Sequence, residues 1–469
     1  MRTPAHTGTG SGGRHSLVRR GGITAPEPMR RSRSGASASS GPICATGRPP
    51  TVTTTRSPPS ATRTDSASVA RNSRMPTART EDVSTCVHKQ SCTGGRKPAI
   101  ISPMNFAFTD EQEELRKTVR SFLENKSSEE AVREQMETDN GFDPAVWSQM
   151  GEQMGLQGLS IPEEFGGSGY GFVELGIVLE EMGRALLCAP FFSTAVLAAN
   201  ALLQSGDDAA KAKYLPGIAS GETIATLAYV EPSGKWDESG ITMQATKSGD
   251  GYTLSGTKSF VLDGNTADLI IVAAKTDAGT SLFAVAGDAP GLTRTNLSTM
   301  DQTRKQAKID FDNTPATLIG EEGKGWDTLQ TVLDLAAEQV GGAQKVLEMA
   351  VDYAKVRVQF GRPIGSFQAI KHKCADMLLE VESAKSAAYY AAWAAAEESA
   401  ELPAVAALAK AYVSDAYFHC AAENIQIHGG IGFTWEHDAH LYFKRAKSSE
   451  LLFGDATYHR ELLAQRIGI

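Results

Sequence analysis

The order of apolar patterns along this chain is the feature that most limits how it can fold. Residues 104–221 repeat apolar side chains at helical spacing, and Thr109 with Gln112 has the spacing of a capping box. Residues 222–325 form short β-branched runs separated by turn residues, which is typical of a small antiparallel β domain. Residues 326–469 return to long, alanine-rich helical patterns with short links, which favour a bundle. The sequence therefore predicts a mainly α fold with a central β domain.

Residues 1–103 differ in composition from the rest of the 469-residue chain. They carry 16 basic and 4 acidic side chains, against 30 and 51 in residues 104–469, and few large apolar ones. Such a stretch buries too little apolar surface to offset the entropy lost on ordering, so we expect a disordered leader. Because MNFAFTDEQEELR, beginning at Met104, has the form of a natural start, we interpret the leader as a mis-assigned start. A transit peptide and a nucleic-acid-binding arm are the alternatives.

Charge, hydropathy and cysteine spacing exclude several classes of function. The acidic body argues against a nucleic-acid partner, and no run of about 18 apolar residues predicts a membrane span. Six cysteines are scattered without a CxxC pair, which indicates free thiols in a reducing cytoplasm and no zinc site. The sequence also lacks the glycine-rich patterns of a Rossmann dinucleotide site and of a P-loop.

Two segments of the last helical region carry the most specific patterns. Residues 357–377, RVQFGRPIGSFQAIKHKCADM, join two predicted helices through a tight Gly/Pro turn. Residues 426–438, QIHGGIGFTWEHD, end a helix with a pair of glycines. Their patterns R-x-x-F-G-x-P-I-x-x-F-Q and Q-x-x-G-G-x-G-F, in this order after a β domain, make residues 104–469 resemble the acyl-CoA dehydrogenase family.

The resemblance implies both a fold and an activity. The fold would have an N-terminal helical domain, a central β domain and a C-terminal four-helix bundle. The activity would be the FAD-dependent α,β-dehydrogenation of an acyl-CoA thioester to the trans-2-enoyl-CoA. FAD would lie between domains and across a subunit interface of a tetramer, and an electron-transferring flavoprotein would accept the electrons.

The resemblance also places Arg357, Phe360 and Gln368 on the FAD of a neighbouring subunit. A pyrophosphate needs paired, planar donors, and a guanidinium supplies a charge-assisted fork of this kind. The alternative for Arg357 is a helix-surface arginine that pairs with a carboxylate.

Further cofactor residues follow from the same resemblance. Gln426, Gly429 and Gly430 match the family segment that meets FAD, where glycines let the main chain approach closely. The two glycines also suit a helix C-cap. Phe260, in KSFVLDG, stands where many relatives carry Trp beside the flavin ring. Ser233, in the rewritten loop YVEPSGKWDESG, is the candidate substrate or cofactor contact.

The position of the catalytic base is altered. In much of the family a Glu immediately before a Gly removes the α-proton of the thioester. Aligning Gly454 and Arg460 with the family puts Phe453 at the Glu position, and a phenyl ring cannot accept a proton. Asp455 stands two residues later. In relatives with the base on the first bundle helix, the equivalent position here is Thr331, which is also not a carboxylate.

Three readings of this loss remain open. Asp455 could act as a displaced base, in a self-sufficient enzyme. The chain could instead be the base-lacking partner subunit of a heteromeric acyl-CoA dehydrogenase, in a heterotetramer and not a homotetramer, and Asp455 would then only cap the last helix. In the third reading Asp455 is only an N-cap with no chemical role, which is compatible with the second reading. Some other use of the fold, such as a non-oxidative acyl-CoA-binding or flavin-binding protein, is the remaining alternative. Glu338 lies two helical turns from Thr331 and matches no motif.

The histidines carry no clear chemistry in the sequence. We interpret His372 and His428 as structural, hydrogen-bonded residues and not as acid–base groups. His437, His440 and His459 show no metal-ligand spacing, so we expect no metal site.

Overall fold

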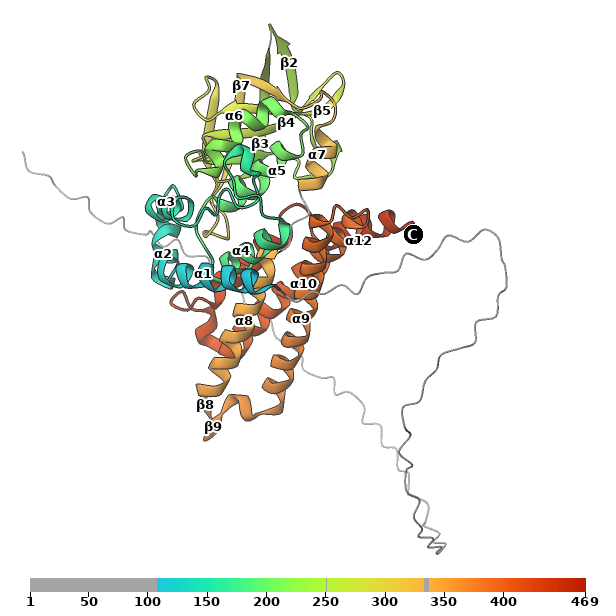
Figure 1. The fold of residues 1–469 in the computed structure, drawn as a ribbon. Helices are drawn as coiled ribbons and strands as arrows, with labels where there is room; N and C mark the ends of the chain where they lie inside the picture. Colours follow the sequence, from blue (N-terminus) through green and yellow to red (C-terminus); the bar gives the residue numbers. More distant parts are fainter. Residues whose placement is uncertain (1–107, 250, 333–336) are drawn as a thin grey trace, which may run out of the picture. The chain divides into compact units, whose positions relative to one another are not determined.

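The described part of the chain follows the predicted order of helices, sheet and helices. The computed structural model describes residues 108–249, 251–332 and 337–469. The leader predicted to be disordered, residues 1–103, and the expected start at Met104 lie outside the described residues. In Figure 1 the colours run from the N-terminal helices through the strands to the C-terminal helices, so the predicted fold class is confirmed.

The N-terminal helical domain begins at a capped helix. The main-chain N–H of Gln112 donates to Thr109 Oγ1 at 3.2 Å, and that of Thr109 donates to Gln112 Oε1 at 3.0 Å. The predicted capping box is therefore confirmed. The elements of this domain are α1 (Asp110–Lys126), α2 (Glu129–Glu137), α3 (Pro144–Glu152), η1 (Glu163–Phe165), α4 (Phe172–Arg184), the π-helix η2 (Phe192–Ala198), α5 (Ala199–Leu203) and α6 (Asp208–Ala219).

The central domain is a sheet whose strand path closes on itself. Its elements are β1 (Ala225–Ala228), η3 (Glu238–Gly240), β2 (Gln244–Ser248), β3 (Gly251–Leu262), β4 (Leu269–Thr276), β5 (Gly279–Ala286), β6 (Leu292–Asn296) and β7 (Gln306–Ile319). The order is β1-β4-β2-β3-β7-β5, β6 pairs with β7, and β5 also pairs with β4. Most pairs are antiparallel, as predicted, but β1 runs parallel to β4 and so does β2. Pairing between strands so far apart in the chain cannot be read from local pattern.

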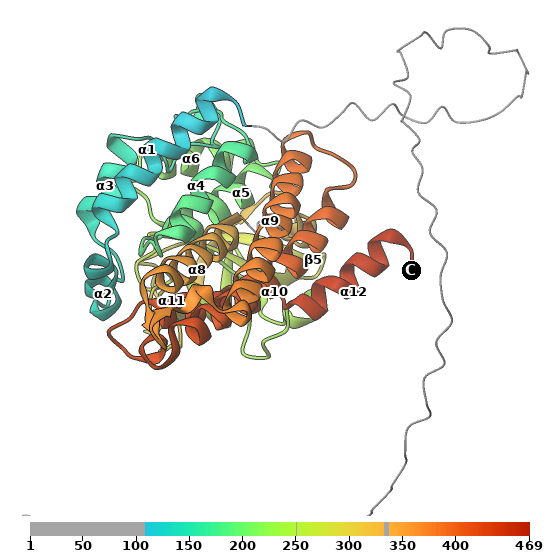
Figure 2. The same ribbon diagram turned by 90° about the horizontal axis from the view of Figure 1, so that it is seen from below.

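The C-terminal domain is a helical bundle. Its elements are α7 (Gly325–Val332), α8 (Ala337–Val356), β8 (Val358–Gln359), β9 (Arg362–Pro363), η4 (Ile364–Ser366), α9 (Gln368–Ala396), α10 (Leu402–His428), η5 (Gly429–Phe433), α11 (Ala439–Leu451) and α12 (Ala456–Ile467). Figure 2 shows α8, α9, α10 and α11 packed together. Small side chains permit this close packing: a Cβ at Gly342 of α8 would lie 2.4 Å from the ring of Tyr417 of α10.

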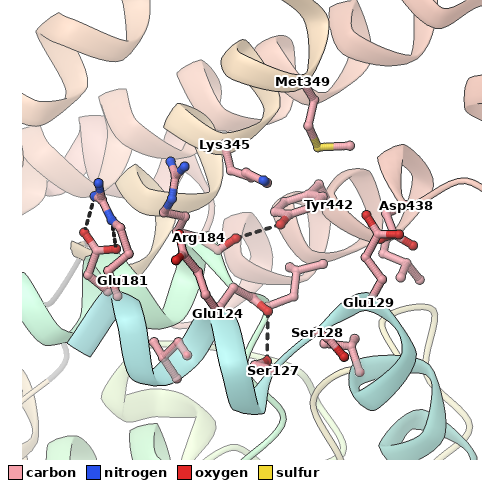
Figure 3. A pocket seen from close by; sticks show the side chains of 16 residues that line it. Glu124, Ser127, Ser128, Glu129, Glu181, Arg184, Lys345, Met349, Asp438 and Tyr442 are labelled. Carbon is pink, nitrogen blue, oxygen red and sulfur yellow. Dashed lines mark hydrogen bonds and ion pairs between the residues drawn. The ribbon is translucent and has the colours of Figure 1, made fainter. Parts of the chain in front are cut away.

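Polar contacts attach the N-terminal helices to the bundle. They surround a cavity of about 220 Å³ between α1, α2, α4, α8 and α11 (Figure 3). Tyr442 of α11 donates its hydroxyl to the carbonyl of Arg184 at 2.6 Å, and the guanidinium of Arg184 pairs with Glu348 of α8 at 2.5 Å. No helix within the described residues combines the length and the apolar character needed to cross a bilayer.

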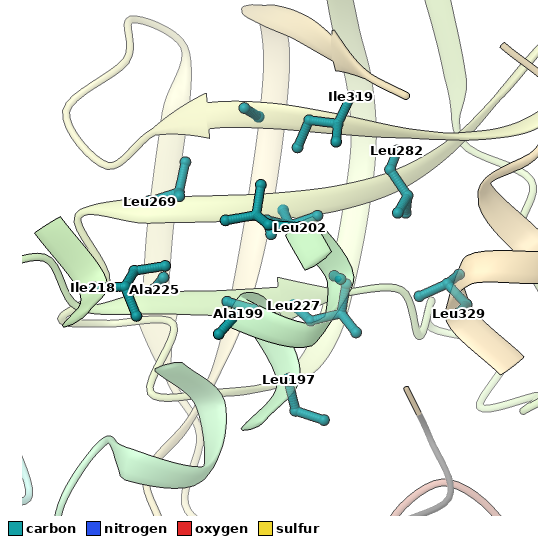
Figure 4. Close-up of a cluster of buried hydrophobic side chains, with 14 of the residues drawn as sticks. Leu197, Ala199, Leu202, Ile218, Ala225, Leu227, Leu269, Leu282, Ile319 and Leu329 are labelled. Atoms are coloured by element: carbon teal, nitrogen blue, oxygen red, sulfur yellow. The ribbon is translucent and has the colours of Figure 1, made fainter. Parts of the chain in front are cut away.

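The last two helices of the N-terminal domain, α5 and α6, share a core with the β domain. Leu202 of α5 and Ile218 of α6 pack against strand residues such as Leu227 and Leu282, and each of these side chains is almost fully buried (Figure 4). Each buried leucine or isoleucine contributes about 1.5–3 kcal/mol to folding. Phe453, which precedes α12, lies at the edge of the same core. The core therefore connects the predicted base position with the β domain.

Candidate active site

An apolar cavity of about 410 Å³, here called the central cavity, lies where η2, the β domain and the segment before α12 meet. Its walls include Leu197 of η2, Leu227 and Phe260 of the β domain, and Leu452 and Phe453 of the C-terminal segment. Volume and lining are those of a site for a small organic ligand. The sequence predicted two of its residues, Phe260 and the altered base position.

Phe453 closes one side of the central cavity. Its ring stacks on Phe192 of η2, with centroids 6.2 Å apart, and lies 6.1 Å from the ring of Tyr229. Phe453 is buried and has a φ of +64°, which is unfavourable for a bulky side chain. At the position where the family resemblance leads us to expect a carboxylate, the cavity therefore has an aromatic wall.

Asp455 serves as the N-cap of α12. Its Oδ1 accepts the main-chain N–H of Tyr458 at 2.8 Å, and its backbone is extended, as in an N-cap. Asp455 is not among the residues that line the central cavity. Asp455 therefore has the N-cap geometry that one reading of the sequence assigned to it.

Asp301 is the only carboxylate among the described residues that line the central cavity. It is almost fully buried, and it accepts the main-chain N–H of Thr303 at 3.0 Å and Nε of Arg445 at 3.1 Å. Arg445 also pairs with Glu338 of α8 at 2.5 Å, and Arg304 pairs with the same Glu338. The Asp301 carboxylate is therefore already bound to a main-chain donor and to an internal cation.

Glu338, noted in the sequence without a motif, belongs to this buried ionic cluster. Burial alone would raise the pKa of Glu338, but Arg304 and Arg445 outweigh it, and the pKa is lowered. Glu338 does not line the central cavity, and Thr331 does not line it either. The cluster connects α8 and α11 with the loop before β7.

The β-domain side of the cavity presents an aromatic side chain and a rewritten loop. Phe260 is 52 % exposed and has a φ of +58°. The loop is held from within by a buried ion pair of 2.8 Å between Glu231 and Lys258. Trp236 lines the cavity and contacts Tyr458, whereas Ser233 is exposed and does not line it. Sequence reasoning missed Trp236 because no pattern marks a lone tryptophan in a loop.

The remaining predicted cofactor residues gather at the far end of the bundle, and none of them lines the central cavity. The ring of His428 stacks on Tyr353 at 4.2 Å, which places the end of α10 beside the end of α8. This brings the two predicted groups to one end of the bundle: Arg357, Phe360 and Gln368 with Gln426, Gly429 and Gly430. All six are exposed.

This end of the bundle is open. Phe360 is 92 % exposed, and within the described residues the guanidinium of Arg357 has no hydrogen bond or ion pair. A Cβ built at Gly429 or Gly430 would meet nothing within 4 Å. Gly429 has a φ of +65° and follows α10, so it also serves as the predicted helix cap, but no packing within the described residues explains Gly430. Free donors, a bare aromatic ring and open main chain are what a flat anionic cofactor would need.

His428 and His459 have structural contacts, whereas His372, which we predicted to be hydrogen-bonded, is exposed and has no hydrogen bond within the described residues. His428 is buried, and its Nδ1 lies 2.9 Å from the carbonyl of Asn424; burial lowers the pKa of His428. Nε2 of His459 lies 3.0 Å from the carbonyl of Phe453. Within residues 108–249, 251–332 and 337–469, no three His, Cys, Asp or Glu residues are placed to hold a metal ion.

Comparison with known proteins identifies the family. The chain matches the N-terminal domain of acyl-CoA dehydrogenase over residues 109–222, the middle domain over 226–314 and the C-terminal domain over 323–468. This chain belongs to the acyl-CoA dehydrogenase family and is an oxidoreductase of that class, as the sequence motifs predicted.

Individual relatives cover most of the described chain. Acyl-CoA dehydrogenase IpdE2 of Mycolicibacterium smegmatis is 38% identical over 74% of this chain and 95% of its own length. Among solved structures, butyryl-CoA dehydrogenase of Megasphaera elsdenii superposes with a TM-score of 0.73 at 29% identity, over 78% of this chain and 100% of that one. A chain of the ChsE4-ChsE5 complex of Mycobacterium tuberculosis superposes with a TM-score of 0.72 at 30% identity, over 78% and 99%.

Proposed function

We propose that this chain is the base-lacking subunit of a heteromeric acyl-CoA dehydrogenase. The complex would carry out the FAD-dependent α,β-dehydrogenation of an acyl-CoA thioester, with this chain contributing FAD-interface residues and not the catalytic carboxylate. The observation that carries the proposal is that the central cavity is lined by Phe453 and, as the only carboxylate among its described lining residues, by Asp301. The first is a hydrocarbon wall at the base position, and the second is a carboxylate already bound to Arg445.

The chemistry of the dehydrogenation explains why these two lining residues matter. A base must take the proton on the α-carbon of the thioester, and FAD, when bound, takes the β-hydrogen as hydride. The base must stand within hydrogen-bond reach of that proton in a dry site. The central cavity is apolar enough, but a phenyl ring accepts no proton, and Asp301 is occupied.

Asp455 fits the role of a cap better than that of a base. Its carboxylate is directed to the first turn of α12, where it satisfies a main-chain donor and faces the positive end of the helix dipole. To reach the cavity it would have to abandon this cap. The geometry therefore supports the partner-subunit reading over the displaced base.

The residues present fit FAD in two places. Phe260 offers a half-exposed ring beside the central cavity, where the flavin of this chain would stack. The guanidinium of Arg357, which has no polar partner within the described residues, and the open main chain at Gly429 and Gly430 would hold the cofactor of a neighbouring subunit, with Gln426 beside them. This surface serves another chain's site and not the chain's own.

The same surface supports a tetramer with a homologous subunit. Apolar side chains flank the predicted cofactor residues there: Val356, Val358, Phe360, Phe433 and Trp435 are each more than half exposed. Exposed apolar groups gathered around free polar donors are typical of an interaction site. One structural neighbour, ChsE4-ChsE5, is a complex of two different chains. An electron-transferring flavoprotein would be the acceptor, in the cytoplasm.

Co-expression tests the proposal. The full chain is produced with a homologous chain that retains the Glu-Gly-Thr segment, and the product is examined by size-exclusion chromatography with light scattering and by flavin absorbance. We expect a mixed tetramer that holds FAD and is bleached by an acyl-CoA under anaerobic conditions. A homotetramer of this chain that bleaches without the second chain would overturn the proposal.

A further inference from the structure

The side chains beneath the Phe453 turn (residues 451–455) point to a role that the sequence did not show. Phe453 at φ +64° and Gly454 at φ +108° form a turn that is unfavourable for a phenylalanine. Strain of this kind persists only where the surroundings hold it. The contacts that hold the turn are therefore informative.

His459 holds the turn from α12. Its Nε2 lies 3.0 Å from the carbonyl oxygen of Phe453. Burial lowers the pKa of His459 to about 4, so at neutral pH the ring is uncharged and donates through Nε2–H. The residue is 2 % exposed and does not line the central cavity, so it reaches the cavity only through Phe453.

Lys410 holds the turn from α10. Its ammonium donates to the carbonyls of Ser449 and Glu450 at 2.8 and 3.1 Å and to the hydroxyl of Ser414 at 3.0 Å. The two carbonyls belong to the last turn of α11, where main-chain acceptors lack partners within the helix and the dipole favours a cation. Lys410 is 3 % exposed, and burial lowers its pKa to about 7. These three hydrogen bonds, at the base of the Phe453 turn, compensate the cost of burying the ammonium.

The geometry points to Lys410 and His459 as positioning residues: together they hold the Phe453 turn in the one conformation that directs side chain 453 into the central cavity. Lys410 fixes where α11 ends, and His459 fixes the carbonyl of residue 453 itself. Neither side chain touches the cavity, so each acts through the main chain. The inference deepens the proposed function, because any side chain at this position, a carboxylate included, would be aimed by the same two contacts.

A fluorine probe at position 453 tests this without FAD, acyl-CoA or a partner chain. In the full chain, 4-fluorophenylalanine is placed at residue 453 and its fluorine NMR spectrum is recorded in the parent and in each variant. We expect one line for the parent chain, and several lines or a broadened one for His459→Met and for Lys410→Met. His459→Gln retains an N–H donor, so it should restore the single line.

Lys447→Met is the matched control. Lys447 lies in α11, the helix whose last carbonyls Lys410 binds, but it pairs with the carboxylate of Glu450 at 2.9 Å and not with a main-chain carbonyl of the turn. Lys447→Met should leave the fluorine line of residue 453 unchanged. Lines for His459→Met and Lys410→Met that coincide with the parent line would overturn the inference. If Lys410→Met does not fold, the comparison of His459→Met with His459→Gln decides it, and neither result depends on whether the proposed function is correct.

Discussion

The Phe453 turn and the open end of the bundle differ in two respects: whether the family motif is kept, and whether its side chains have partners within the described residues. At the turn, the family pattern is altered, and contacts within the chain hold it: Phe453 stacks on Phe192, and Asp455 caps α12. At the open end, the family pattern is intact, yet Arg357 and Phe360 are exposed, and within the described residues the Arg357 guanidinium has no polar partner. This contrast is what the proposed function expects: residues that would serve a neighbouring subunit are kept, and the carboxylate for the chain's own chemistry is absent from the base position. A self-sufficient enzyme would show the reverse at the turn.

The largest expected effect comes from restoring a base at the turn. Phe453→Glu places a carboxylate in the central cavity at the position held by the same main-chain contacts. We expect the rate of anaerobic flavin reduction by acyl-CoA to rise about 100-fold or more over the parent, which is the usual contribution of a positioned base. Phe453→Gln has nearly the same shape and no base, and should stay inactive. Equal rates for the two variants would mean that the cavity is not a dehydrogenation site.

The second test removes the guanidinium of Arg357 at the open end of the bundle. Arg357→Ala should weaken FAD binding by the assembled complex about 10- to 100-fold, the usual loss of a charge-assisted hydrogen bond. The thermal midpoint of the chain alone should not change, because Arg357 is exposed and has no polar partner within the described residues. Lys355→Ala, two residues away with a surface pair to Asp352, is the control. A fluorescence titration with FAD measures cofactor binding in Arg357→Ala and in the Lys355→Ala control.

A third test concerns acid stability at the turn. Burial lowers the pKa of His459 from its ordinary value of 6.5 to about 4 in the folded chain. Between these values the unfolded chain binds a proton that the folded chain does not, so stability is lost as the pH falls through this window. We expect His459 to account for a loss on the order of 2 kcal/mol between pH 7 and 4. Urea unfolding of His459→Gln should show a flatter pH profile, and an unchanged slope would contradict this.

The smallest effect separates a cap from a base at Asp455. Asp455→Ala should lower the free energy of unfolding by about 1 kcal/mol, because the N–H of Tyr458 loses its acceptor. Asp455→Ser retains a capping oxygen and should stay within a few tenths of the parent. Flavin reduction by the mixed tetramer should be the same in both. If Asp455→Ser abolishes turnover while preserving stability, then Asp455 is the base.

The order of helical and strand regions could be predicted because apolar periodicity and helix capping depend on residues close together in the sequence. Apolar periodicity located the helical and strand regions, and Thr109 with Gln112 marked the start of α1 correctly. The parallel pairing of β1 with β4 was missed because it joins segments 44 residues apart. The motifs identified the family and the residues of the open end.

The central cavity could be predicted only in part. The alignment placed Phe453 at the base position, but its positive φ and its stacking on Phe192 depend on packing between domains. Lys410 is one lysine in a long alanine-rich helix, and from the sequence alone it would be expected to face solvent. It is buried because the end of α11 packs on it. Asp301 is equally inconspicuous until Arg445, 144 residues later, is beside it.

The central claim is that this chain alone cannot remove the α-proton of an acyl-CoA. The decisive measurement mixes the purified full chain, saturated with FAD and free of oxygen, with straight-chain, branched and cyclic acyl-CoAs, and follows the flavin absorbance. We predict that the flavin stays oxidised with every one of them and is bleached once a homologous chain with an intact Glu-Gly-Thr segment is added. Bleaching by the chain alone would contradict the claim and would locate a base within this sequence.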